Sequence, residues 1–270
     1  MRIALAQQYL VGDPEENIVQ GLDTLRKAKD QGADLVAFPE LAFWPFFPQA
    51  KRGGAPLRYQ ETIPGPTTDR FAALAKELGI VVVLNLFEED AGKTYDSSPV
   101  IDSDGTIAGV ARMLHIMDGP GFHERDYYDP GDRGALVCDT ACGRVGVAIC
   151  YDRHYPEYMR ALALKGAQVV VVPQAGVVDE WTPGLYEAEL QVAAFQNGYF
   201  TALANRVGED GELTFCGRSF ATDPSGAILD QAPLGEEGIL YADLDFDLLE
   251  TCPAKKHFLE DRRPEIYPLG

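Results

Sequence analysis

The stretch VGVAICYDRHYPEYMR, residues 145–160, has the pattern of a buried strand that leads through a polar turn into a helix. Five mostly apolar residues precede Cys150, as expected where a strand is covered on both faces. Pro156 stands near the start of the helical pattern, a position that proline favours. A thiol at the end of a buried strand raises the question of what would make it react, and the answer has to come from other parts of the chain.

Short strands and helical patterns alternate along the rest of the sequence. The strand-like runs, in chain order, are RIALAQ, ADLVAFPE, IVVVLNLFE, SPVIDSDG, RVGVAIC, AQVVVVPQ, YFTALANRVG, SFATDPSG and GILYADLD. The helical patterns, each with apolar residues on one face, cover residues 17–32, 67–79, 156–166 and 186–198. DSDG at 102–105 and DPSG at 223–226 predict hairpin turns. These patterns predict an α/β fold of mixed sheets covered by helices, and since no linker divides the sequence we expect a single domain over residues 1–270.

The composition is that of an ordinary globular protein, with 46% hydrophobic and 24% charged residues among 270. The net charge of −19 argues against nucleic acid or an anionic membrane as partner, because both require basic patches. The acidity has two interpretations, a solvated acidic surface or the steering of cationic substrates. No apolar run approaches the about 20 residues that span a bilayer, and MRIALAQQYL lacks the apolar region of a signal peptide. We therefore expect a cytoplasmic protein.

The cysteines and histidines form no metal-binding pattern. The five cysteines are Cys138, Cys142, Cys150, Cys216 and Cys252. They include no CxxC pair, and none of the four histidines belongs to a ligand cluster. We expect reduced thiols, no metal and no other cofactor.

Three predicted strands end in residues of chemical interest, namely Glu40, Cys150 and Gln174. In open α/β folds, ligands bind beyond the carboxyl ends of the strands. A carboxylate within hydrogen-bonding reach of a thiol can take its proton, and the helix near Pro156 would present its positive end to the thiolate. The alternatives are a cysteine that only fills a buried position and a glutamate that lies on the surface.

Several motifs together resemble the nitrilase superfamily of carbon–nitrogen hydrolases. They are FPEL at 38–41, YYDPGD at 127–132, GRVGVAICYDRHYPE at 143–157, LALKGAQVVVVP at 162–173, and ANRVG followed by GRSFATDPSG within 204–226. The resemblance runs in order from MRIALAQ to DRRPEIY and covers essentially the whole chain. It implies an αββα sandwich of two mixed sheets, paired into an αββα–αββα homodimer or a larger assembly.

The resemblance also implies roles for four residues. Glu40 matches the general base, and Cys150 matches the nucleophile that forms a thioester with the acyl group of the substrate. Glu124, in FHERDYYDPGD, matches a second glutamate that positions the substrate. The backbone N–H of Tyr151, directly after the nucleophile, matches a donor to the oxyanion.

The sequence departs from the family pattern at one catalytic position. Relatives carry a lysine two residues before a histidine, where this chain has Met113 before His115, and no lysine occurs between Lys93 and Lys165. The resemblance implies that the lysine stabilises the thiolate and then the tetrahedral oxyanion. Loss of one oxyanion donor typically lowers the rate by about 10²–10³, and loss of a nearby positive charge raises a cysteine pKa. Either the activity is low or another group takes this role.

The candidates for that role are the nearby cationic side chains. If residues 109–116 form a strand, His115 lies on the side of the missing lysine and Arg112 on the opposite side. Arg153 and His154 follow the thiol by three and four residues and are better placed. In N-carbamoyl amino acid amidases the matching positions help to hold a substrate carboxylate, which is one role that the resemblance implies for Arg153.

The alternative for Arg153 is an ion pair with Asp152 or Glu157.

The aromatic loop FWPFFPQ at 43–49 has two interpretations as well. It can wall the mouth of a pocket, with Phe46 as a lining residue, or it can pack at a subunit interface.

The substrate pocket is expected to include Phe46, Arg153, His154, Gln174 and Trp181. The aromatic loop and GPGFHERDYYDPGD resemble most the N-carbamoyl branch, which includes N-carbamoylputrescine amidases and N-carbamoyl-D-amino acid amidases. The acidic pair before Trp181, in VVDEWTPGLYEAE, would suit a substrate amine.

The sequence therefore predicts a cofactor-independent amidase that hydrolyses a small linear amide or N-carbamoyl compound through a thioester on Cys150, with release of ammonia. The alternative is a catalytically impaired protein of the same fold that binds a small ligand or a protein partner. Retention of Glu40, Glu124 and Cys150 favours the enzyme, and Met113 favours the alternative.

Overall fold

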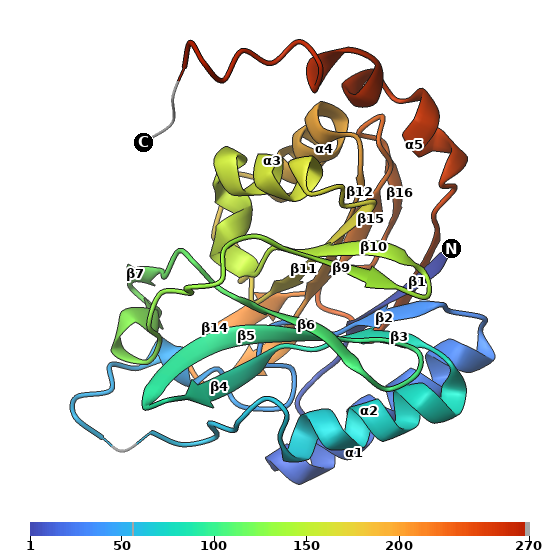
Figure 1. The fold of residues 1–270 in the computed structure, drawn as a ribbon. Helices are drawn as coiled ribbons and strands as arrows, with labels where there is room; N and C mark the ends of the chain where they lie inside the picture. Colours follow the sequence, from blue (N-terminus) through green and yellow to red (C-terminus); the bar gives the residue numbers. More distant parts are fainter. Residues whose placement is uncertain (56, 268–270) are drawn as a thin grey trace.

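The computed structural model describes residues 1–55 and 57–267 of the chain. Two mixed sheets lie face to face, with α1 and α2 on the outer side of one and α3 and α4 on the outer side of the other (Figure 1). The layers follow the order helix, sheet, sheet, helix, and the predicted αββα sandwich is thus confirmed.

The first sheet has the strand order β17-β1-β2-β3-β5-β4, with β6 beside β5. Its strands are β1 Arg2–Gln7, β2 Leu35–Ala37, β3 Val81–Val83, β4 Leu86–Asp90, β5 Lys93–Ile101, β6 Ile107–Arg112 and β17 Gly238–Asp243. β1, β2 and β3 run parallel, and the other strands pair antiparallel. The carboxyl ends of the parallel strands therefore meet at one edge, where Glu40 follows β2.

The second sheet has the order β16-β15-β12-β11-β10-β9. Its strands are β9 Leu136–Thr140, β10 Gly143–Val147, β11 Val169–Gln174, β12 Phe200–Asn205, β15 Phe220–Thr222 and β16 Ile228–Gln231. β10, β11 and β12 run parallel, so Cys150 after β10 and Gln174 at the end of β11 lie at the same edge. Two short hairpins complete the fold, β7 Asp118–Gly119 with β8 Phe122–His123 and β13 Val207–Asp210 with β14 Leu213–Cys216.

The four predicted helices are present, and their ends lie within three residues of the predicted ranges. They are α1 Pro14–Asp30, α2 Pro66–Leu78, α3 Pro156–Leu164 and α4 Leu185–Asn197. α1 has a capping box, in which Asp13 accepts the Glu16 N–H at 3.0 Å and Glu16 accepts the Asp13 N–H at 3.2 Å. α2 and α4 end at Gly79 and Gly198, whose φ angles of 61° and 70° are left-handed values that glycine adopts without strain.

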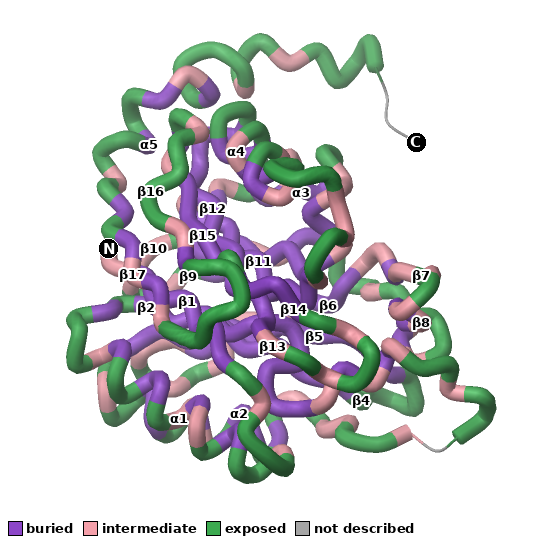
Figure 2. Tube along the Cα trace, turned by 180° about the vertical axis from the view of Figure 1, so that it is seen from behind, coloured by how far each residue is buried: buried purple, intermediate pink, exposed green. Residues whose placement is uncertain are grey.

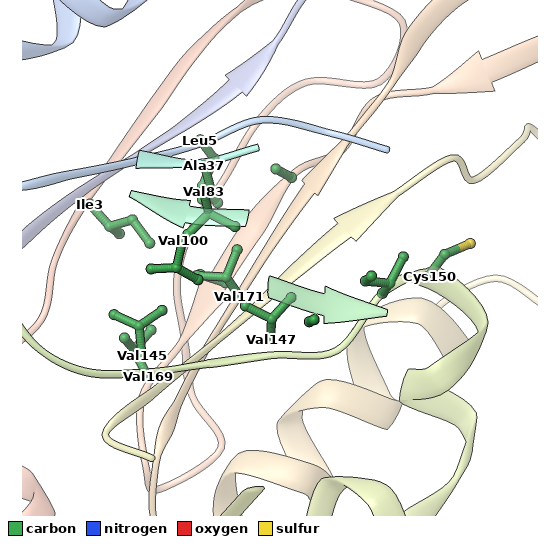
Figure 3. Packing of buried hydrophobic residues seen from close by; sticks show 14 of the residues in the cluster. Ile3, Leu5, Ala37, Val83, Val100, Val145, Val147, Cys150, Val169 and Val171 are labelled. Carbon is green, nitrogen blue, oxygen red and sulfur yellow. The ribbon is translucent and has the colours of Figure 1, made fainter. Parts of the chain in front are cut away.

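The strands are apolar on both faces because both faces are covered. In β1, Ile3 and Leu5 pack between the sheets, whereas Ala4 and Ala6 pack beneath α1 and α2. Figure 2 shows that buried residues are concentrated in the sheets and that exposed residues gather on the outer sides of the helices. Figure 3 shows part of the inner cluster, where valines of both sheets meet.

Two strand predictions need correction. Residues 80–88 form two strands rather than one, because the side chain of Asn85 interrupts them by accepting the Leu41 N–H at 2.8 Å. The strand expected over 109–116 ends at Arg112, since the N–H groups of the next residues turn to the Asp152 carboxylate. The alternation argument for residues 113–116 therefore fails. Both predicted hairpin turns are confirmed, between β5 and β6 and between β15 and β16.

The C-terminal segment lies on the outer helical layer. After α5, Asp247–Thr251, the chain forms the turn η4, Ala254–Phe258, against α4, where the rings of Phe258 and Phe195 are 5.3 Å apart (Figure 1). Among residues 1–55 and 57–267, no helix is long and apolar enough to cross a membrane.

Candidate active site

The structure brings the three strand-end residues together. Glu40 lies close enough to the Cys150 thiol for the two groups to shift each other's pKa, although no well-aligned hydrogen bond joins them. Gln174 donates from Nε2 to Cys150 Sγ at 3.3 Å. The thiol thus lies between a carboxyl group from the first sheet and a carboxamide from its own sheet.

Cys150 occupies a strained position at the start of the 3₁₀ helix η3, Cys150–His154, with a φ of 42°. Such a conformation costs about 1–3 kcal/mol, so the surroundings must hold it. Arg153 Nη1 donates to the Cys150 carbonyl at 3.2 Å and closes the turn. The first N–H groups of a helix have no acceptor within it, and this leaves the Tyr151 N–H available beside the thiol. The Cys150 side chain is directed away from the packed valines (Figure 3).

The backbone around Glu40 is held from two sides. Leu41, with a φ of 46°, donates its N–H to Asn85 Oδ1. Arg206 Nη1 donates to the Glu40 carbonyl at 3.2 Å, while its Nη2 pairs with Asp210 at 2.7 Å. These contacts fix the carboxyl group of Glu40 without occupying its oxygens.

Three fully buried carboxyl groups lie in the site: Glu40 and Glu124 interact with the thiol, and Asp96 interacts with both glutamates. Burial, together with the nearby Asp96 and Glu124, raises the pKa of Glu40 well above its usual range. Burial raises the pKa of Asp96 to about 7, and burial with the nearby Asp96 raises the pKa of Glu124. Burial and the two glutamates raise the pKa of the Cys150 thiol. The cluster therefore holds protons that a solvated cluster would lose.

Five oxygen atoms of this cluster have no hydrogen-bond partner among the described residues, although their side chains are buried. They are Glu40 Oε1 and Oε2, Asp96 Oδ2, Glu124 Oε1 and Tyr128 Oη. Glu40 lies near the thiol and Asp96, but neither of its oxygens makes a well-aligned hydrogen bond. Each buried polar group that lacks a hydrogen-bond partner costs about 1–3 kcal/mol of stability. The cluster is therefore suited to a ligand that is rich in hydrogen-bond donors.

Replacing Asp96 by asparagine tests the titration of the cluster. Asn85 Nδ2 donates to Asp96 Oδ1, and the amide oxygen of asparagine can accept the same bond, so the fold is expected to persist. The pKa of the Asp96 carboxyl group is about 7 in the folded chain and about 3.9 in the unfolded chain. The group therefore contributes its full stability only at pH values below the pKa of the unfolded chain. That stability is lost as the pH rises through the higher value.

We therefore expect the melting temperature of Asp96→Asn to exceed that of the unmodified chain by a small margin at pH 4.5. The margin grows up to about pH 7 and then levels off. Thermal unfolding followed by circular dichroism at several pH values measures it. A difference that does not change with pH would contradict the raised pKa of Asp96.

Arg153 is engaged behind the thiol. Its Nη1 donates to Gln174 Oε1 at 2.9 Å, and its Nε lies 3.1 Å from Glu189 Oε2. The ion pair expected with Asp152 or Glu157 is wrong, because Glu189 on α4 is closer to the buried guanidinium. Arg153 thus orients the carboxamide that meets the thiol, and its role toward a substrate carboxylate stays a prediction.

His154 and Trp181 lie next to this group. His154 Nδ1 is 2.7 Å from Glu189 Oε1, and its ring meets the Trp181 ring edge to face at 5.1 Å. Trp181 lines a pocket of about 140 Å³ together with Glu180 and Tyr186. Tyr186 donates to Glu180 at 2.5 Å, and its hydroxyl is close enough to Cys150 for their charges to interact. Tyr186 thus links this pocket to the surroundings of the thiol, although Cys150 is not among the residues that line it.

Met113 is fully buried and belongs to the same apolar cluster as Cys150. The backbone N–H of Met113 donates to the backbone carbonyl of Asp96 at 2.9 Å, so Met113 lies next to one residue of the acidic cluster. The thioether supplies no positive charge there.

The cationic residues near Met113 are engaged elsewhere. Arg112 is bound by Glu88 at 2.7 Å and 2.8 Å and by Asp132 at 2.9 Å. His115 Nδ1 lies 2.6 Å from Asp152 Oδ1, and this contact ties the segment after β6 to η3. Neither residue is among the groups that contact the thiol.

The aromatic loop at 43–49 is divided between two layers. Phe46 is buried near the site, where its ring meets those of Phe122 and Phe215 at 5.6 Å and 5.5 Å. Phe43 packs under the outer helices and stacks on Phe71 at 5.2 Å. For Phe43, both the pocket mouth and the subunit interface were wrong expectations, because the ring is fully buried within the chain.

Several residues of the site were not predicted from the sequence: Asn85, Asp96, Tyr128, Glu189 and Arg206. Tyr128 and Arg206 belong to the motifs YYDPGD and ANRVG, which signalled their importance but not their contacts. Asp96 lies within a strand, where nothing local marks it as part of the site.

Comparisons with known proteins identify the family of this chain. The sequence profile of the carbon-nitrogen hydrolase family matches residues 2–254. An N-carbamoylputrescine amidase of Solanum tuberosum is 34% identical over 99% of this chain and 93% of its own length.

Solved structures show the same fold. The crystal structure of a carbon-nitrogen hydrolase from Helicobacter pylori G27 superposes with a TM-score of 0.91 at 32% identity, covering 99% of this chain and 97% of the other. A variant of the amidase from Nesterenkonia sp. AN1 superposes with a TM-score of 0.84 at 28% identity, covering 99% of this chain and 95% of the other. That structure shows the acetamide moiety of fluoroacetamide added covalently at the active-site cysteine.

Proposed function

Because this chain belongs to the carbon–nitrogen hydrolase family, we propose that it is an amidase that hydrolyses a small linear amide or N-carbamoyl compound through a thioester on Cys150. The observation that carries the proposal is the buried carboxyl group of Glu40 close enough to shift the pKa of a thiol held at a φ of 42°. The name of the potato relative, an N-carbamoylputrescine amidase, supports the N-carbamoyl class of substrate.

The proposed reaction begins with proton transfer from the Cys150 thiol to Glu40, since burial raises the pKa of both groups and the proton passes directly between them. The sulfur attacks the carbonyl carbon, and the Tyr151 N–H donates to the oxygen that becomes negative. Glu40 then returns the proton to the departing nitrogen, and ammonia leaves. A water molecule, deprotonated by Glu40, hydrolyses the thioester and restores the thiol.

Glu124 and Gln174 have positioning roles in this proposal. Glu124 Oε2 accepts the Met117 N–H at 3.1 Å, and this bond directs its free Oε1 toward the substrate N–H groups. Gln174 donates to the sulfur and is itself fixed by Arg153. Nothing in the comparisons favours the alternative of an impaired binding protein, because the relatives are named as enzymes.

The test is a panel of short carboxamides, N-carbamoyl amines and nitriles, with ammonia release and peptide mass mapping as readouts. We expect ammonia above background with at least one class and an acyl adduct on Cys150 during turnover. Ammonia without an adduct would point to direct attack by water. Neither signal across the panel would contradict the amidase.

We also propose that the chain acts as one domain and as a homodimer, as the resemblance implies. The outer face of α4 exposes Leu185 and Val192 by 47% and 50%, and such apolar side chains are suited to burial against a second copy.

A further inference from the structure

The reacting centre contains no ion pair for any of its three carboxyl groups. Both oxygens of Glu40 are unpartnered, and Asp96 and Glu124 each have one unpartnered oxygen among the described residues. The remaining oxygens accept from neutral donors, the Asn85 carboxamide and the Met117 N–H. Buried carboxylates normally have a cationic partner, because burial of an isolated charge is costly.

The two nearest arginines do not supply the missing charge. Arg206 is bound to backbone carbonyls and to Asp210. Arg153 is bound to Gln174 and lies against Glu189. Each arginine therefore reaches the site already paired with a carboxylate of its own, and among the described residues neither forms an ion pair with Glu40, Asp96 or Glu124.

The unpartnered atoms indicate the chemistry of the missing partner. Four of the five are carboxyl oxygens and the fifth is the hydroxyl of Tyr128, which lies beside Glu40, Asp96, Glu124 and Cys150. All five can accept a hydrogen bond. A primary carboxamide offers two N–H donors and a carbonyl that itself needs a donor, whereas an amidinium group offers four N–H donors, a positive charge and no acceptor.

A metal ion does not fit the same place. Within the described part of the chain, no group of three or more His, Cys, Asp or Glu side chains is arranged to hold one. A planar organic cation can instead reach acceptors that are spread over several elements, as the guanidinium of arginine does with carboxylates.

From these contacts we propose that the site hydrolyses small amidinium or guanidinium compounds, whose delocalised cation replaces the missing positive charge between Glu40, Asp96 and Glu124. The proposal rests on the proposed function for the nucleophile and general base, and it extends the substrate class to these cations. It also gives the acidity of the chain a use, because a net charge of −19 attracts a cationic substrate to the protein.

The reaction balances with water as the only co-reactant. The Cys150 proton passes to Glu40, the sulfur bonds to the amidinium carbon, and the C=N electron pair moves to nitrogen, which gives a neutral tetrahedral adduct. Glu40 protonates one nitrogen, ammonia leaves, and a cationic thioimidate remains on the sulfur. Water, deprotonated by Glu40, adds to the carbon, and the C–S bond breaks as Glu40 returns that proton to the departing sulfur. The hydroxyl proton of the adduct is taken up by ammonia, so the products are a carboxamide (or a urea from a guanidinium), ammonium and the free thiol.

This chemistry explains why an apolar residue suits position 113. Addition of a thiolate to an amide creates an oxyanion that a lysine would stabilise, but addition to an amidinium neutralises a charge and creates no oxyanion. A lysine would therefore repel the cationic substrate and stabilise nothing in its transition state. Met113 leaves the three carboxyl groups free to ionise against a bound cation, which lowers the pKa of a neighbouring carboxyl group.

The experiment compares two matched alkylating probes, chloroacetamidine and chloroacetamide, which differ only in the charged group. We expect the cationic probe to alkylate Cys150 at least about 10-fold faster, and Met113→Lys to lower that ratio by at least about 10²-fold, because like charges brought together are strongly disfavoured. Peptide mass mapping locates the adduct, and Cys138→Ala serves as the matched control. Ammonia release from acetamidinium, methylguanidinium, acetamide and methylurea provides the turnover comparison.

Preference for the neutral probe and turnover of amides alone would overturn this inference and leave the amidase intact. Alkylation and turnover of neither class would remove both proposals. If Met113→Lys does not fold, calorimetry compares the binding of acetamidinium and acetamide to Cys150→Ala. Tighter binding of acetamidinium supports the proposal, and weaker binding contradicts it.

Discussion

Replacement of Cys150 by alanine is expected to lower kcat/KM for ammonia release by at least about 10⁴-fold, because the covalent route depends on the sulfur. The variant is expected to fold. The thiol is buried and its raised pKa keeps it uncharged in the resting site, so alanine removes one uncharged atom. Steady-state ammonia release with the best substrate of the panel measures the loss, and circular dichroism checks the fold.

Cys138→Ala is the matched control, since Cys138 is also buried but lies on β9 beside Gly109. We expect it to keep activity within about 2-fold, as substitutions away from a site usually do. A Cys150→Ala variant that retains more than a tenth of the activity would rule out the thioester. Loss of activity in both variants would instead point to damage of the sheet.

Glu40→Gln is expected to lower kcat/KM by about 10²–10⁴-fold, the usual contribution of a general base. Glutamine has nearly the same shape but cannot take the proton of the thiol. Covalent trapping is expected to slow as well, since attack by the sulfur needs that transfer. The matched control is Glu61→Gln, which alters a partly buried carboxyl group outside the site that accepts the Thr67 N–H at the start of α2.

The pH profile of the unmodified chain tests the same residue. The base must be ionised, so kcat/KM is expected to rise with pH through the pKa of Glu40, which lies well above the usual carboxyl range. The Asp96 carboxyl group contributes to that raised pKa, so Asp96→Asn is expected to move the acidic limb to lower pH. An acidic limb near the usual pKa of a glutamate, unchanged in Asp96→Asn, would contradict the role of Glu40.

Much of the fold follows from local sequence. The run VVVV at 169–172 is apolar throughout because one face packs between the sheets and the other beneath α3 and α4, and this covering predicts the layers. Helix ends at Gly79 and Gly198 follow from the left-handed conformation that glycine adopts. The errors lie at strand ends such as Arg112, where a distant side chain rather than the local pattern terminates pairing.

The sequence by itself determined the strand-end positions of Glu40, Cys150 and Gln174, because parallel strands end at one edge of a sheet. Tertiary structure decided which groups meet them. Asp96 comes from an antiparallel strand, and Arg206 holds Glu40 across 166 positions of the chain. The raised pKa values follow from burial between the two sheets, and burial depends on how the layers pack. No local pattern encodes it, and the raised carboxyl pKa values around Cys150 are therefore a property of the folded chain alone.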